Sequence, residues 1–178
     1  LLAAIDRSYR GGNAIAGLAQ ELTTELATVE GEVGGLLGLN QVAAEDAPVV
    51  RLLASVFEEA LKTRASDIHV EPQEKALRIR FRIDGVLHVK TEADAKIAGA
   101  VALRLKLMSG LDIAEKRLPQ DGRFHVKLKA GAVDVRISTM PTQYGESVVM
   151  RLLNQSGGLL SLDRLQLPPE MAAALQRA

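Results

Sequence analysis

The segment that most constrains the fold is ALRIRFRIDGVLHVK, at residues 76–90. Residues 77–83 alternate strictly between apolar and basic side chains. The apolar ones are Leu77, Ile79, Phe81 and Ile83, and the basic ones are Arg78, Arg80 and Arg82. A period of two is typical of a strand with one buried face. Asp84-Gly85 is a pair favoured in two-residue hairpin turns, so VLHVK should return as the next strand. These residues predict an antiparallel sheet.

The flanking segments carry further helix and strand patterns. Apolar residues recur at three- and four-residue steps, which predicts three helices: one that ends at about Glu30, one that ends near Arg64, and one from about Asp94 to Met108. Asp46 is a candidate N-cap, with Pro48 in the first turn. Residues 66–72 read as a short strand, 118–122 as a turn, and 123–129, 132–139 and 147–153 as strands. We therefore expect an α+β fold: an antiparallel sheet of about six strands with helices mainly on one face, preceded by a helical segment.

Three parts are expected along the chain. Residues 1–43 are a helical tail of a preceding domain plus a Gly-rich linker, 44–156 an α+β domain, and 157–178 a linker and the start of a further domain. The Gly-rich run at 31–40 is not a phosphate loop, because no Gly-Lys pair occurs anywhere in the sequence. The sequence starts in an apolar run without a methionine and stops within a helical pattern, so we expect both ends to be cuts inside a longer protein.

Composition narrows the class of protein. The chain has no cysteine, which excludes disulfides and cysteine-based zinc sites. Its 22 basic and 22 acidic residues balance overall, but residues 64–129 hold 14 basic and 9 acidic side chains, which favours anionic partners. No apolar run approaches the roughly 20 residues that a membrane-spanning helix needs. A cytoplasmic location is the expectation.

Two groups of polar residues could form a binding site, but a structural role is the favoured interpretation of each. Asp67, His69 and Glu71 alternate along one strand and could hold a divalent metal, but no second histidine lies nearby, so a polar strand face is favoured and no metal site is expected. His88 and His125 are interpreted as structural.

Arg78, Arg80 and Arg82 could bind the phosphate backbone of a nucleic acid. Aromatic residues make up only 3% of the chain, however, so the side chains on which bases would stack are missing. Nucleic acid is not expected as a partner.

Arg136 and Arg151 stand on the two strands of a predicted hairpin whose turn is marked by Pro141 and Gly145. Pairing could place both guanidinium groups on the same edge or face. The planar guanidinium groups, with their parallel N–H donors, suit the oxygens of a polyphosphate. Spacing alone nevertheless favours ion pairs of these arginines with carboxylates of the same fold. Glu146 could orient them or be a surface charge. The sequence contains no nucleophile–base pair, metalloprotease motif or serine-hydrolase elbow.

Four ordered motifs carry a resemblance: RASDIHVEP, FRIDGVL, LDIAEKRLPQDGR and DVRISTMPTQYGESVVMRLL, with DAPVVRLL before them. Together they resemble the domain that precedes the motor in type II secretion and type IV pilus assembly ATPases, over about residues 44–165. The resemblance implies that 157–178 begins the motor domain. The parent would then be a homo-hexameric ATPase, cytoplasmic and peripheral at the inner membrane, using ATP and magnesium.

The family resemblance assigns roles to residues. By motif, Arg136 and Arg151 match the arginines that reach the nucleotide phosphates, and so are the catalytic and nucleotide-binding candidates. Arg117 and Arg123, in RLPQDGR, are read as interdomain or subunit contacts. Expected partners are the motor domain of the same chain, neighbouring subunits, an inner-membrane platform and cytoplasmic adaptors. Lacking a phosphate loop, this segment alone should neither hold the nucleotide and magnesium nor hydrolyse ATP. The alternative is a stand-alone adaptor or ligand-binding module that docks an acidic partner.

Overall fold

The computed structural model describes residues 2–29, 48–129 and 131–153. The elements in chain order are α1 (Leu2–Val29), α3 (Pro48–Lys62), β1 (Asp67–Pro72), β2 (Ala76–Ile83), β3 (Val86–Asp94), the 3₁₀ turn η1 (Ala95–Ile97), α4 (Ala98–Ser109), β4 (Gln120–Leu128), β5 (Gly131–Thr142) and β6 (Gly145–Leu153). The predicted Gly-rich linker, the Asp46 cap and the segment 157–178 lie outside the described residues. Within the described chain, no helix is both long enough and apolar enough to cross a membrane.

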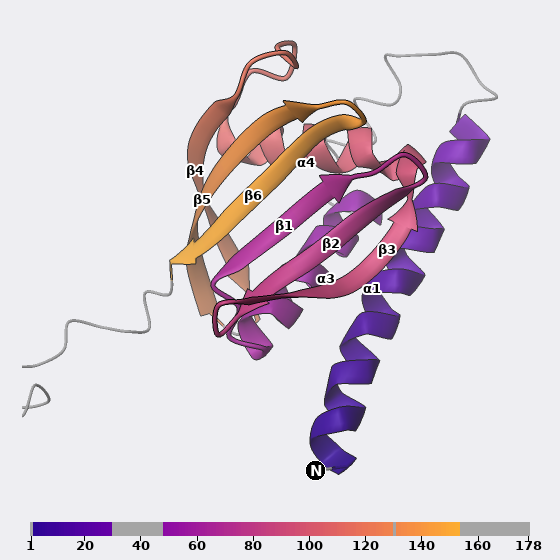
Figure 1. Cartoon of the computed structure of the whole chain (residues 1–178), viewed down its shortest axis with the longest axis vertical. Coiled ribbons are helices and arrows are strands. Elements are labelled where there is room, and N and C mark those ends of the chain that lie inside the picture. The colour runs from indigo at the N-terminus through magenta and orange to yellow at the C-terminus, as the bar shows by residue number, and fades with distance from the viewer. Residues whose placement is uncertain (1, 30–47, 130, 154–178) are drawn as a thin grey trace, which may run out of the picture.

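The six strands form one sheet in the order β3-β2-β1-β6-β5-β4, and every neighbouring pair is antiparallel. Helices α3 and α4 lie behind the sheet in Figure 1, and α1 runs beside its β3 edge. The predicted α+β fold, with helices mainly on one face and a helical segment in front, is confirmed. Because β1 sits in the middle of the sheet, it joins two hairpin-built halves that are far apart in sequence.

The predicted tight turn after β2 is confirmed. Asp84 and Gly85 have φ values of 49° and 82°, the left-handed pair that a two-residue hairpin turn requires. Further along β2 and β3 the register shifts between Ile79 and Arg80, whose partners are Thr91 and Val89. This bulge leaves one extra residue in the edge strand, which is a common way to discourage further strand pairing at an edge.

Several predicted boundaries differ from the observed ones. The helix expected from about Asp94 to Met108 starts where predicted, but its first turn is the 3₁₀ turn η1, where the Asp94 carboxylate caps the backbone by accepting from the Lys96 amide. The turn expected at 118–122 is shorter, because β4 already starts at Gln120. Strands β5 and β6 also extend further toward each other than predicted: Pro141 pairs with Glu146 inside the ladder, and the turn itself is at 143–144.

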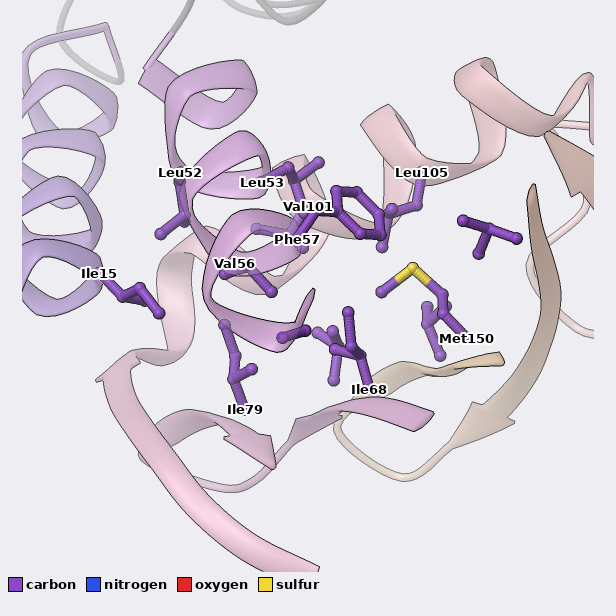
Figure 2. Packing of buried hydrophobic residues seen from close by; sticks show 14 of the residues in the cluster. Ile15, Leu52, Leu53, Val56, Phe57, Ile68, Ile79, Val101, Leu105 and Met150 are labelled. Atoms are coloured by element: carbon purple, nitrogen blue, oxygen red, sulfur yellow. The ribbon is translucent and has the colours of Figure 1, made fainter. Parts of the chain in front are cut away.

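The hydrophobic core lies between the helices and one face of the sheet. Figure 2 shows Phe57 of α3 pointing toward Val101 and Leu105 of α4, above Ile68 and Met150 of the central strands. All five are at most 2% exposed. Burying a side chain of this size stabilises a fold by about 1.5–3 kcal/mol, so this face of the sheet is fixed by packing. Helix α1 adds Ile15, Ala19 and Leu22 to the same core.

Strand alternation therefore turns the intervening residues to the other side of the sheet, which we call the open face. No described helix covers the open face (Figure 1). Its charged and polar residues include Asp67, His69, Glu71, Arg78, Arg80, Arg82, Glu92, Asp121, Arg123, His125, Lys127, Asp134, Arg136, Ser138, Ser147 and Arg151. Both arginines predicted as site residues are on this face.

Candidate functional site

A line of directly opposed residues crosses five strands of the open face. Its register pairs are Arg82 with Asp67, Asp67 with Arg151, Arg151 with Arg136, and Arg136 with Arg123. We call these five residues the arginine row. Opposed side chains on one face of an antiparallel pair have Cβ atoms about 4.5–5.5 Å apart. The row therefore brings four guanidinium groups and one carboxylate from five strands together.

The predicted pair, Arg136 and Arg151, is directly opposed across β5 and β6. Pairing of the hairpin therefore places both on the same face, one of the two outcomes expected from the sequence. Arg136 lies in the middle of β5 rather than at a strand end, because that strand continues to Thr142. Both side chains are exposed. The described residues offer Arg136 no ion pair within 4 Å, whereas Arg151 contacts Asp67.

Asp67 is the buried centre of the row, with a side chain only 7% exposed. Its Oδ1 lies 3.1 Å from Arg151 Nε, its Oδ2 lies 3.3 Å from Arg82 Nε, and the Ser66 hydroxyl donates to Oδ2 at 2.7 Å. Burial alone would raise the pKa of Asp67. The Ser66 hydrogen bond and the two arginines outweigh that effect and lower the pKa below its usual 3.8. Asp67 is therefore ionised and fixes the direction of Arg151.

A shallow pocket of about 500 Å³ opens over the β4–β5–β6 end of the row. Its lining residues are Asp67, Asp121, Gly122, Arg123, Arg136, Ile137, Ser138, Val149 and Arg151. Three arginines thus border one depression, with one carboxylate from the row at its edge. The other carboxylate in the lining, Asp121, accepts a hydrogen bond from the Ser138 hydroxyl. Such a pocket can take an anion with several oxygen atoms.

The arginines of β2 are placed differently from those of the pocket. Arg78 Nε lies 2.7 Å from Glu92, Arg80 contacts Glu71, and Arg82 contacts Asp67. The strip considered for nucleic acid is therefore real, since all three share the open face, but each charge already has a carboxylate partner. The arrangement favours the structural interpretation.

The structure also accounts for the weak metal candidate. Asp67, His69 and Glu71 do share one face, but Asp67 and Glu71 are engaged by arginines, and His69 has a lowered pKa caused chiefly by burial. Nowhere in the described ranges do three or more histidine, cysteine or acidic residues gather in a way that could hold a metal ion.

Glu146 does not have either of the roles considered for it. It lies on the helix side of the sheet, where its carboxylate is 2.5 Å from Lys106 Nζ, and both side chains are almost fully buried. Lys106 Nζ also donates to the Glu115 carbonyl oxygen at 2.6 Å. Glu146 is therefore neither an orienting partner of Arg136 and Arg151 nor a surface charge, because strand alternation places Glu146 and Arg151, five residues apart in β6, on opposite faces of the sheet.

Three residues of this site were missed from the sequence: Asp67, Arg82 and Arg123 as neighbours of the predicted pair. A signal for Arg123 existed, because Arg123, His125 and Lys127 alternate in charge with Phe124 and Val126. The expected strands 123–129 and 132–139 contain both arginines, but the pairing of Leu128 with Gly131 sets the register that places Arg123 opposite Arg136. Asp67 and Arg82 carried no such local signal, because the β1–β6 pairing joins distant segments.

Comparisons with known proteins identify the family. A model of the family described as "Type II/IV secretion system protein" matches residues 42–178. The type IV pilus assembly ATPase PilB of Myxococcus xanthus is 52% identical over 124 residues, which is 69% of this chain and 22% of that protein. The type II secretion system protein E of Aeromonas hydrophila is 51% identical over 123 residues, 69% of this chain and 25% of that protein.

A third relative extends the match along the chain. The type II secretion system protein E of Xanthomonas campestris is 44% identical over 151 residues, which is 85% of this chain and 26% of that protein. The chain thus spans about a quarter of the length of these relatives. With a family model over most of its length and close relatives in both branches, this chain belongs to the type II/IV secretion system protein family.

Proposed function

We propose that this chain is the domain in front of the motor of an ATPase that powers type II secretion or type IV pilus assembly. In this proposal Arg136 and Arg151 contact the phosphates of ATP when the motor domain closes over the open face. The observation that carries it is the direct opposition of these two arginines beside an open pocket. The names of the relatives, a pilus assembly ATPase and secretion proteins, support the same activity.

The chemistry of the pair fits a transferring phosphoryl group. Each guanidinium keeps its charge at any physiological pH and presents parallel donors that match phosphate oxygens. Arg136 has no carboxylate partner among the described residues, so its charge is available to a ligand. Arg151 has one donor, Nε, committed to Asp67 at 3.1 Å, and this contact holds the rest of the fork over the pocket. Charge that develops on the phosphoryl oxygens would be offset by both groups.

The rest of the machinery belongs, in this proposal, to other parts of the protein. The two carboxylates of the pocket are unsuited to magnesium, because Asp67 is bound by Arg82 and Arg151 and Asp121 is bound by Ser138. The magnesium ligands and the phosphate loop would come from the motor domain. Assembly as a homo-hexamer, peripheral at the cytoplasmic side of the inner membrane, with a membrane platform and adaptors as partners, completes the proposal.

The test is ATPase activity of the full-length protein. Arg136→Ala and Arg151→Ala should each lower kcat, by about 10³-fold if they act as arginine fingers do. Arg78→Ala is a matched control, since it removes a charge from the same face outside the pocket, and it should retain near wild-type kcat. The 178-residue chain by itself should turn over no ATP.

Two results would count against this function. Wild-type rates in both arginine variants would remove the pair from the mechanism and favour the adaptor alternative, in which the basic face docks an acidic protein. Magnesium-dependent ATP turnover by the 178-residue chain alone would show that the catalytic groups lie within it. Circular dichroism of each variant separates loss of rate from loss of fold.

A further inference from the structure

The structure separates two arginines that the sequence places six residues apart. Arg117 lies before β4, its side chain is 88% exposed, and it pairs with Glu115 at 3.2 Å. Arg123 lies within β4 on the open face, directly opposite Arg136, and borders the same pocket as Arg136 and Arg151. The two arginines therefore lie in different settings, although the family resemblance gives both as interdomain or subunit contacts.

The charge balance around Arg123 calls for an anion. Like charges directly opposite each other on a sheet destabilise it, yet Arg123, Arg136 and Arg151 are three consecutive members of the row. Within the described residues, neither Arg123 nor Arg136 has an ion pair. The nearest carboxylate on the same strand and face, Asp121, is engaged by the Ser138 hydroxyl. Arg123 and Arg136 are therefore solvent-exposed charges without a direct carboxylate partner among the described residues, and a bound anion would relieve their repulsion.

The length of this part of the row indicates the kind of anion. Neighbouring strands lie about 4.8 Å apart, so the three strands β6, β5 and β4 spread the arginines over roughly 10 Å. A single phosphate group cannot contact both ends of such a row, whereas a chain of linked phosphates can. The pocket runs along the same three strands.

We propose that Arg123 is a third phosphate-binding residue of this site and extends it for a polyphosphate chain. The inference rests on the proposed function and deepens it, because it concerns the same pocket. Arg123 adds a contact at the outer end of the row, on the edge strand β4, beyond the two arginines that the family motifs indicate. Arg117 takes no part.

The experiment measures binding of inorganic tripolyphosphate and of orthophosphate to the 178-residue chain by NMR titration at low salt. The variants are Arg123→Ala, Arg136→Ala and, as the matched control with the same loss of charge, Arg117→Ala. Arg123→Ala should weaken tripolyphosphate binding about fivefold to tenfold, as loss of a charged hydrogen bond at an exposed site would. Orthophosphate binding should change less than twofold, and Arg117→Ala should change neither by more than twofold.

The outcomes are distinguishable. Equal losses in Arg123→Ala and Arg117→Ala would mean a general charge effect and would overturn the role of Arg123. A loss in Arg136→Ala without one in Arg123→Ala would also overturn it, while leaving the two-arginine function intact. Failure of the wild-type chain to bind tripolyphosphate at tens of millimolar would overturn the polyphosphate site itself. The ATPase test above, made on the full-length protein, decides the proposed function independently.

Discussion

The two halves of the open face carry three arginines each and differ in what surrounds them. In the β1–β2–β3 half, Arg78, Arg80 and Arg82 follow one another along β2, and each meets a carboxylate from a neighbouring strand. In the β4–β5–β6 half, Arg123, Arg136 and Arg151 stand one per strand, so they meet each other. The same residue type on the same face is therefore neutralised in one half and concentrated in the other.

The difference teaches that the direction in which a series of arginines runs, along one strand or across several, decides whether carboxylates can pair with it. Arginines spaced along one strand leave the neighbouring strands free to supply acids, and β1 and β3 do so. Arginines placed across strands occupy the positions where those acids would stand. Asp67 in β1 marks the boundary, since it contacts the last arginine of one half and the first of the other.

The largest expected effect on this comparison comes from Asp67→Asn, which removes the charge at the boundary and keeps the shape. Arg82 and Arg151 lose their shared partner, so the free energy of unfolding should fall by about 1–3 kcal/mol, as for hydrogen bonds to charged groups. Urea denaturation at pH 7 measures it. Glu92→Gln, at the exposed Arg78 pair, is the control and should change stability by less than about 1 kcal/mol. Equal losses of stability in Asp67→Asn and Glu92→Gln would contradict the role of Asp67 as the shared partner of the two halves.

The same variant gives a pH test with a definite sign. The folded-state pKa of Asp67 lies below its usual 3.8, so the unfolded chain binds the proton more readily. The stabilisation is fully present above pH 3.8 and is lost as the pH falls through the folded-state pKa. The gap between wild type and Asp67→Asn should therefore shrink in acid. A gap that stays constant would contradict the assignment.

An intermediate effect should separate the halves directly. Arg80→Ala leaves Glu71 without its closest cation in a half-buried setting, and should destabilise the fold by about 1 kcal/mol. Arg136→Ala removes an exposed charge between two like charges, and should change stability by less than about 0.5 kcal/mol or increase it. Chemical denaturation of the two variants side by side measures the contrast. A larger loss in Arg136→Ala would show that the row is already neutralised.

The smallest expected effect concerns His69, on strand β1 of the neutralised half. Burial lowers its pKa below 6.5, and Arg82 and Arg80 act in the same direction, while Glu71 and Asp67 oppose them. The unfolded chain therefore binds the proton first as the pH falls, so the wild type should lose stability from pH 6.5 downward through the folded-state pKa. Thermal melts of His69→Gln over that range should lack this slope. The same pH dependence of stability in His69→Gln as in the wild type would mean that another group takes up the proton.

The sequence predicted what depends on neighbours along the chain. The alternation in β2, the Asp84-Gly85 turn and the shared face of Arg136 and Arg151 all arise within single hairpins, and all three are present. The strand boundaries around the 118–122 turn were less predictable, because Gly122 admits two local structures. In the fold Gly122 lies within β4, and a Cβ there would be 3.0 Å from Leu111 Cδ2, so the close packing of Leu111 favours glycine at this strand position.

What the sequence could not predict depends on pairing between distant strands. Asp67 and Arg151 are 84 residues apart, and only the β1–β6 register brings them together. The ion pair of Glu146 has a similar cause: strand alternation turns this residue away from Arg151, and only the packing of α4 on the sheet brings Lys106 to it. A period-two pattern therefore shows that residues share a face, but the face and the partners are set by the whole sheet.

Asp67 and a phosphate bound in the pocket would both interact with Arg151, so proton binding and phosphate binding are linked thermodynamically. Arg151 is one of the groups that keep the Asp67 proton affinity low. An anion that shares Arg151 must therefore raise that affinity, and reciprocity requires that protonation of Asp67 strengthen anion binding by the same factor. Proton binding by Asp67 and anion binding by Arg151 are thus coupled. The proton affinity of Asp67, in β1, would change when an anion occupies the pocket beside it.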